Sequence, residues 1–116
     1  MPQRANPLPV VFFATSAGTE PVREWLRELD RDDRREIGSD ILAVQRGWPL
    51  GLPLCRSLGR GLREVRSSLA GGRIARIIFA FDEQTIVLLN GFIKKTRKTP
   101  AAEIDLALNR LKEMTS

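Results

Sequence analysis

The spacing of apolar residues near the start of the chain predicts a strand followed by a helix. Residues 8–14 form a short apolar run that opens among prolines, which are tolerated where a strand starts. Thr19 is expected to cap a helix that has Glu20 and Pro21 in its first turn and ends near Asp30. The apolar residues that recur at helical spacing within it are Val22, Trp25, Leu26 and Leu29.

A second helical pattern follows directly. Its apolar stripe consists of Ile37, Ile41, Leu42 and Val44. The stripe predicts a helix over residues 32–46, which Gly47 is expected to end, so that the two helices form a hairpin. Residues 47–61 are rich in proline and glycine, and we therefore interpret them as a loop.

Three β-rich runs separated by short turns come next. Residues 62–67 have the length of a strand, residues 70–72 are a turn of alanine and glycine, and residues 73–81 are rich in isoleucine and phenylalanine. After a tight turn at residues 82–83, residues 85–93 are apolar on both alternating faces, which indicates a strand inside the sheet. The three runs predict an antiparallel meander.

The chain closes with a helix. Thr99 is expected to cap it with Pro100 at the first helical position, and its apolar face consists of Ile104, Leu108 and Leu111. The resulting order is β-α-α-β-β-β-α, an α+β fold in which two N-terminal helices and a C-terminal helix pack on a small antiparallel sheet. Residues 1–116 are expected to form one domain, because a chain of this length supports a single core.

Composition narrows the classes of protein that this chain can be. Apolar residues make up 42% and charged residues 28%, as in globular proteins, and the apolar stretches fall far short of the roughly 20 residues of a membrane helix. We expect a cytoplasmic protein without a secretion signal. A single cysteine, Cys55, excludes an intrachain disulfide, and the absence of histidine removes the usual general base and zinc ligand. No metal or cofactor is expected.

Positive charge is concentrated in the second half of the chain. Lys and Arg total 19 against 14 for Asp and Glu, a formal net charge of +5 that favours a polyanionic partner. The cations concerned are Arg56, Arg60, Arg63, Arg66, Arg73, Arg76, Lys94, Lys95, Arg97 and Lys98. The last four lie between an internal strand and a helix start, where they are well placed to meet phosphates, although a solvated loop has the same composition.

Arg76 is the most informative of these cations. It lies inside the apolar run of residues 73–81, where a lone arginine needs a carboxylate partner or a substrate phosphate. Arg73 is three residues away and must point to the opposite face of the strand. Glu64 shares a face with Arg66 on the preceding strand, and a structural ion pair there is an equal alternative to a catalytic role.

Three segments of the chain resemble a known family. Residues 57–66 read SLGRGLREVR, residues 73–79 read RIARIIF and residues 88–100 read LLNGFIKKTRKTP. Together they resemble the phage-derived, HigB-like branch of the RelE/ParE toxin superfamily over nearly the whole chain, and GFIKKTRKTP is the most specific part. The resemblance implies the toxin of a type II toxin–antitoxin system, whose open sheet face receives mRNA in the ribosomal A site.

The resemblance also implies a mechanism that needs no histidine. In that family the 2′-hydroxyl of the RNA attacks the adjacent phosphate, so the protein need only orient the RNA, neutralise charge and assist proton transfer. The catalytic roles then fall on Arg76, Lys94, Lys95 and Glu64. RNA binding falls on Arg66, Arg73, Asn90, Arg97 and Lys98. Several relatives have histidine or tyrosine where this chain has Asn90, and asparagine cannot carry a proton at neutral pH.

Three functions remain open from the sequence. The resemblance favours a ribosome-dependent mRNA endonuclease, and the lysines after the last strand favour it over a ParE-like poison of DNA gyrase. The third is a non-catalytic basic RNA- or DNA-binding module. The expected partners are mRNA on the ribosome and a cognate antitoxin, a helix-turn-helix protein of HigA type that covers the basic face. The side chains predicted to share that face are Arg66, Arg76, Lys94, Lys95 and Lys98.

Overall fold

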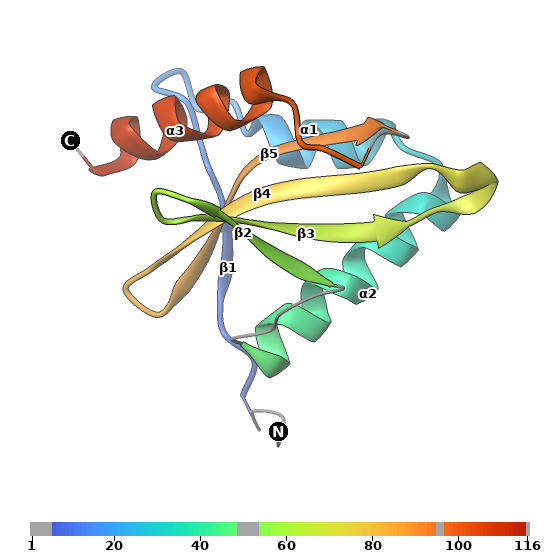
Figure 1. The fold of residues 1–116 in the computed structure, drawn as a ribbon. Helices are drawn as coiled ribbons and strands as arrows, with labels where there is room; N and C mark the ends of the chain where they lie inside the picture. Colours follow the sequence, from blue (N-terminus) through green and yellow to red (C-terminus); the bar gives the residue numbers. More distant parts are fainter. Residues whose placement is uncertain (1–5, 49–53, 95–96, 116) are drawn as a thin grey trace.

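The computed structural model describes residues 6–48, 54–94 and 97–115, which fold into three helices and a five-stranded sheet (Figure 1). The elements are, in chain order, β1 (Val10–Phe12), α1 (Pro21–Glu28), α2 (Arg31–Gly47), β2 (Cys55–Gly59), β3 (Leu62–Ser68), β4 (Ile74–Asp82), β5 (Thr85–Lys94) and α3 (Ala101–Thr115). A single 3₁₀ turn (Ala70–Gly72) joins β3 to β4. The α+β class is confirmed, with β2 as an additional strand.

The sheet has the strand order β1-β5-β4-β3-β2. Strands β3, β4 and β5 form the predicted antiparallel meander, and β5 lies inside the sheet, as its two-sided apolar pattern predicts. Strand β1 runs parallel to β5, with Val11 opposite Val87, so the small antiparallel sheet that the sequence predicts has one parallel edge strand. A tight hairpin forces only consecutive strands to be antiparallel. The chain between β1 and β5 passes through two helices and three strands, which leaves their direction free.

The interpretation of residues 47–61 as a loop is wrong for β2. Cys55 lies opposite Val65 and Arg56 lies opposite Glu64, and the Cys55 side chain is only 1% exposed. Pairing with β3 and burial of one side chain therefore override the local composition, as is common for strands. Residues 49–53 of this stretch lie outside the described residues.

The turn between β4 and β5 fixes the register of the hairpin. Asp82 pairs with Thr85, so the loop has two residues, Glu83 and Gln84, at φ values of 46° and 64°. Two consecutive positive φ angles are the mark of a type I′ turn, whose twist suits a two-residue hairpin. The tight turn predicted at residues 82–83 is present, one residue further along the chain.

Helices cover both faces of the sheet (Figure 1). The core between the sheet and the helices α1 and α2 includes Val22, Ile37, Val44, Val65, Ile77 and Phe79. The core between the sheet and α3 includes Phe13, Leu62, Ile78, Leu89 and Ala107. Two apolar cores explain why β4 and β5 are buried on both faces. No helix of the described part of the chain is long and apolar enough to cross a membrane.

Three local predictions about the helices are wrong. The N-cap position of α1 is Glu20 rather than Thr19, and its side chain makes no capping hydrogen bond. Leu42 is 41% exposed, since the buried stripe of α2 runs through Ile37 and Val44, on another side of the helix. The hydroxyl of Thr99 is used to bond a buried carboxylate, which is described below, and α3 begins only at Ala101.

A close contact between α1 and β5 fixes the position of the first helix. Trp25 packs against the α1 and α2 side of the sheet, as its place in the helical pattern predicts. A Cβ atom added to Gly91 would lie only 2.6 Å from two ring carbons of Trp25. Glycine is therefore required at this position of β5, because it allows the indole to lie against the backbone of the strand.

Candidate nucleic-acid interface

The register of the sheet brings three arginines and one glutamate to the face that α3 partly covers. Arg66 on β3 lies directly opposite Arg76 on β4, and Arg56 on β2 lies directly opposite Glu64 on β3. Directly opposed residues share a face, and so do residues two apart on a strand, such as Glu64 and Arg66. Ile78 belongs to the core under α3 and identifies which face this is. Because opposed like charges repel, this arrangement is costly unless an anion relieves it.

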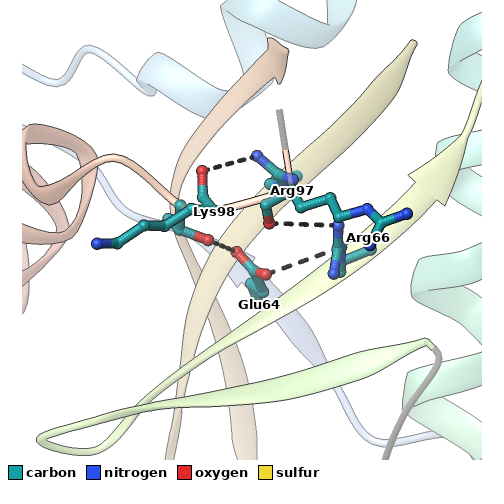
Figure 2. A network of polar contacts seen from close by, with 6 residues as sticks. Glu64, Arg66, Arg97 and Lys98 are labelled. Carbon is teal, nitrogen blue, oxygen red and sulfur yellow. Dashed lines mark hydrogen bonds and ion pairs between the residues drawn. The ribbon is translucent and has the colours of Figure 1, made fainter. Parts of the chain in front are cut away.

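The chain segment that precedes α3 crosses over this cluster (Figure 2). Arg76 Nη1 donates to the carbonyl oxygen of Lys98 at 3.4 Å, and Arg66 Nη2 donates to the carbonyl oxygen of Arg97 at 3.5 Å. The Thr99 hydroxyl donates to Glu64 Oε2 at 2.5 Å. Residues 97–99 are thus held on the sheet through their backbone and one hydroxyl, and in Figure 2 the Lys98 side chain extends away from the Glu64 carboxylate.

The side chains at the centre of the cluster are deeply buried. Glu64 and Arg76 are 0% exposed. The other oxygen of the carboxylate, Glu64 Oε1, lies 3.9 Å from Arg66 Nε, a long ion pair. The pKa of Arg76 is lowered, first by burial and next by the charge of Arg66, with Arg56 acting in the same direction and Glu64 opposing them. The cluster is therefore a concentration of positive charge that a single carboxylate does not balance.

The predicted cations around this cluster occupy different environments. Lys94 ends β5 opposite Ile74 and shares the face of Arg76, with its side chain exposed. Arg97 and Lys98 are also exposed. Lys95, which the sequence assigned a catalytic role, lies outside the described residues. Of the predicted basic face, the structure brings together Arg66 and Arg76 with the backbone of residues 97–98.

Arg73 lies away from this cluster. Its guanidinium donates two hydrogen bonds to the carboxylate of Asp33 on α2, at 2.8 and 3.0 Å. These hydrogen bonds lower the pKa of Asp33 and raise that of Arg73. The opposite orientations of Arg73 and Arg76 agree with their odd spacing, and the Arg73–Asp33 pair ties α2 to the start of β4.

Asn90 fastens α3 to the sheet. Its amide donates to Glu103 Oε2 at 2.9 Å, and its Oδ1 accepts from Arg110 Nη1 at 3.4 Å. The same guanidinium donates to the carbonyl oxygen of Leu89 at 2.7 Å, at a register shift between β4 and β5. Asn90 is 6% exposed. The position at which the sequence resemblance implies histidine or tyrosine thus holds a buried amide that is bonded to α3.

Two residues that take part in this site, Arg56 and Thr99, are not recognisable as site residues from the sequence. Arg56 lies on β2, which its glycine- and proline-rich surroundings concealed, although its alternation with the buried Cys55 is a weak strand signal. The role of Thr99 as a partner of Glu64 depends on how the segment before α3 crosses the sheet. No sequence motif around Arg56 or Thr99 indicates its place in the site.

Other kinds of chemistry find little support in the described residues. Within residues 6–48, 54–94 and 97–115, no group of three or more His, Cys, Asp or Glu side chains is arranged to hold a metal ion. Burial raises the pKa of the Cys55 thiol to about 11, so this cysteine is a poor nucleophile at neutral pH. The chemistry of the site therefore rests on arginine, lysine, glutamate and hydroxyl groups.

A family model described as "Phage derived protein Gp49-like (DUF891)" matches residues 24–112, from α1 into the last turns of α3. The matched range contains every candidate site residue named above. No curated protein matches the chain at a significant level.

Proposed function

The chain belongs to the Gp49-like family of phage-derived proteins, part of the RelE/HigB-like toxin superfamily, and we propose that it is a ribosome-dependent mRNA endonuclease. The observation that carries the proposal is a pair of opposed arginines, the buried Arg76 and the half-buried Arg66, beside a single carboxylate and below an exposed basic segment. A phosphodiester is the anion that such a site on a toxin of this kind would meet.

The proposed reaction uses the RNA as its own nucleophile. The 2′-hydroxyl attacks the adjacent phosphorus, the bond from phosphorus to the 5′-oxygen breaks, and the products are a 2′,3′-cyclic phosphate and a 5′-hydroxyl. One proton leaves the 2′-hydroxyl and one reaches the departing 5′-oxygen. The protein contributes alignment, charge neutralisation and these proton transfers.

Each role falls on a different side chain. Arg76 would neutralise the negative charge that develops on the phosphate, which would replace the carbonyl oxygen of Lys98 as its acceptor. Arg66 would hold the same phosphate from the neighbouring strand, and Lys94 would protonate the departing oxygen. Glu64 would accept the proton of the 2′-hydroxyl, or would position Arg66 through the ion pair already described. Lys95, Arg97 and Lys98 would bind the RNA backbone.

One observation favours a second candidate, a toxin that binds its target without cleaving RNA. Asn90 is held by Glu103 and Arg110 and cannot exchange a proton at neutral pH, and the chain has no histidine or tyrosine to replace it. A ParE-like poison of DNA gyrase or a basic nucleic-acid-binding module would need no such group. The two candidates differ in whether new RNA ends appear.

The family implies an antitoxin partner. We propose that this antitoxin is a helix-turn-helix protein of HigA type and that an acidic or amphipathic segment of it covers the basic face, because an exposed cationic surface binds nucleic acid indiscriminately. Co-purification of the two proteins, followed by mapping of protected amides, tests this. Protection confined to the outer surfaces of α1 and α2 would contradict it.

The enzymatic proposal is tested in a reconstituted translation system. Purified protein is added to ribosomes that translate a defined mRNA, and primer extension maps the ends. We expect cleavage within the A-site codon that depends on ribosomes and disappears when the 2′-hydroxyl at the cleaved position is methylated. Lys112→Ala, which removes an exposed cation from the last turn of α3, is the matched control and should cleave normally. Intact mRNA together with gyrase-dependent DNA breaks would contradict the proposal and support the gyrase poison.

A further inference from the structure

A cavity lies beside the arginine and glutamate cluster, at the edge of the sheet formed by β2. Its volume is about 210 Å³. It is lined by Arg56, Ser57, Leu58, Lys98, Thr99 and Ile104. Strand β2, the segment before α3 and the first turn of α3 therefore all contribute to it.

Arg56 supplies a charge that the protein leaves uncompensated. It faces Glu64 in the register of the sheet, but that carboxylate is engaged by Thr99 and Arg66. Within the part of the chain that the structure describes, Arg56 forms no salt bridge, and its side chain is exposed. Three arginines thus face one carboxylate. Arg56 is the most accessible of them, since Arg66 is half-buried and Arg76 is fully buried.

The other walls of the cavity suit a nucleotide better than a free ion. Lys98 brings a second cation, whose side chain is exposed. Leu58 and Ile104 add apolar surface, which an inorganic phosphate would not use but a ribose can cover. The start of α3 lies beside the cavity, and the dipole of a helix favours negative charge at that end.

We propose that this cavity is a phosphate-binding subsite for one phosphodiester of single-stranded RNA, held by Arg56 and Lys98. The inference rests on the proposed RNA substrate and adds to it a contact outside the Arg66 and Arg76 pair. The RNA backbone would run from that pair toward the β2 edge, so Arg56 would set where the strand continues beyond the reacting phosphate. Its role would be binding and positioning.

The test compares two arginines of equal charge on opposite faces of the sheet. Arg56→Gln removes the cation of the cavity. Arg63→Gln is the control, because Arg63 lies on the other face, over the Trp48 ring at 4.9 Å, and its loss changes the net charge by the same amount. Binding of a fluorescent 2′-O-methyl RNA oligonucleotide is measured by anisotropy across a series of salt concentrations. The methylated RNA cannot be cleaved by 2′-hydroxyl attack, so only binding is measured.

We expect Arg56→Gln to weaken binding about tenfold and to lower the salt slope by about 0.7, the loss of one charge-assisted phosphate contact. Arg63→Gln should stay within about twofold of the parent. Circular dichroism checks that both variants are folded. Equal losses in the two variants, no loss in either, or no RNA binding by the parent at low salt would each overturn the subsite.

Amide shifts distinguish RNA from free phosphate. A 2′-O-methyl dinucleotide should shift the amide signals of Ser57, Leu58 and Ile104, whereas inorganic phosphate at the same concentration should not. Equal shifts with inorganic phosphate would overturn the assignment to RNA. The subsite and the proposed enzyme fail separately. If the protein passes these tests but cleaves no mRNA, the subsite stands and the endonuclease proposal is wrong. If the protein cleaves mRNA but Arg56→Gln binds RNA as tightly as the parent, the subsite is wrong.

Discussion

Replacing Thr99 with valine is the most direct way to test the buried bond that holds the basic segment on the sheet. Valine keeps the shape of threonine and removes only the hydroxyl, which donates to Glu64 Oε2 at 2.5 Å. Thr99 is 5% exposed and Glu64 is 0% exposed, so water cannot replace the lost donor. The carboxylate would retain Arg66, whose nearest nitrogen lies 3.9 Å away.

The expected loss follows from the charge of the acceptor. A hydrogen bond to a buried charged group contributes about 1.5–3 kcal/mol, and we expect Thr99→Val to lower the free energy of unfolding by about 2–3 kcal/mol. For a domain of this size that corresponds to a decrease in Tm of about 10–15 °C. Urea unfolding followed by circular dichroism measures it.

Two further variants sharpen this test. Thr99→Ser keeps the hydroxyl and should recover most of the stability. Thr115→Val removes an exposed hydroxyl near the end of α3, whose bond to the Leu111 carbonyl spans 3.1 Å, and should cost less than about 0.5 kcal/mol. If Thr99→Val were as stable as the parent, the Thr99–Glu64 bond would not hold the segment, and the geometry proposed for the cluster would be wrong.

Three other predictions follow from single contacts. Gly91→Ala should lower the free energy of unfolding in urea by about 1–3 kcal/mol, because the added Cβ would meet the indole of Trp25. Gly38→Ala adds a Cβ in open space on α2 and should raise that free energy by about 1 kcal/mol. Equal effects of the two substitutions would contradict this packing. Asp33→Asn should reduce the loss of stability in acid. The Arg73 guanidinium lowers the pKa of the Asp33 carboxyl below its ordinary value of 3.8. The stability that Asp33 contributes is therefore fully present above pH 3.8 and is lost as the pH falls through the lower pKa of the folded state. Unfolding curves at neutral and acid pH check this, and an unchanged acid dependence would contradict it. Lys98→Ala should weaken RNA binding and lower the salt slope by about 0.7 with little change in the cleavage rate at saturating protein; a large fall in that rate would contradict a backbone-binding role.

The fold was predictable where a periodic pattern coincides with burial. The two-sided apolar run of β5 predicts an internal strand, and the stripe of α2 predicts its buried face apart from Leu42. Strand β2 was not predictable in this way, because its stability comes from pairing with β3 rather than from its own sequence. The parallel direction of β1 likewise depends on packing between distant segments.

The site was predictable only in part, because it too depends on how distant segments pair. Strand alternation places Glu64 and Arg66 on one face and separates Arg73 from Arg76. The register that sets Arg66 opposite Arg76 depends on the turn at Ala70–Gly72, which alternation alone does not fix.

The surroundings of Asn90 likewise depend on a register that the sequence pattern does not fix. Ile78 pairs with Asn90 and Phe79 with Leu88, so Leu89 is an extra residue in β5. Such a bulge changes which side chains share a face. The sequence therefore indicates which residues are chemically informative, and the register decides which of them meet.

The central claim is that Arg76 stabilises charge on a phosphate that is being cleaved. The direct measurement is the single-turnover rate of mRNA cleavage on the ribosome by Arg76→Ala, with circular dichroism to show that the variant is folded. We expect a rate about a hundredfold below that of the parent, a loss of about 3 kcal/mol of transition-state stabilisation. A folded Arg76→Ala protein that cleaves mRNA as fast as the parent would contradict the account.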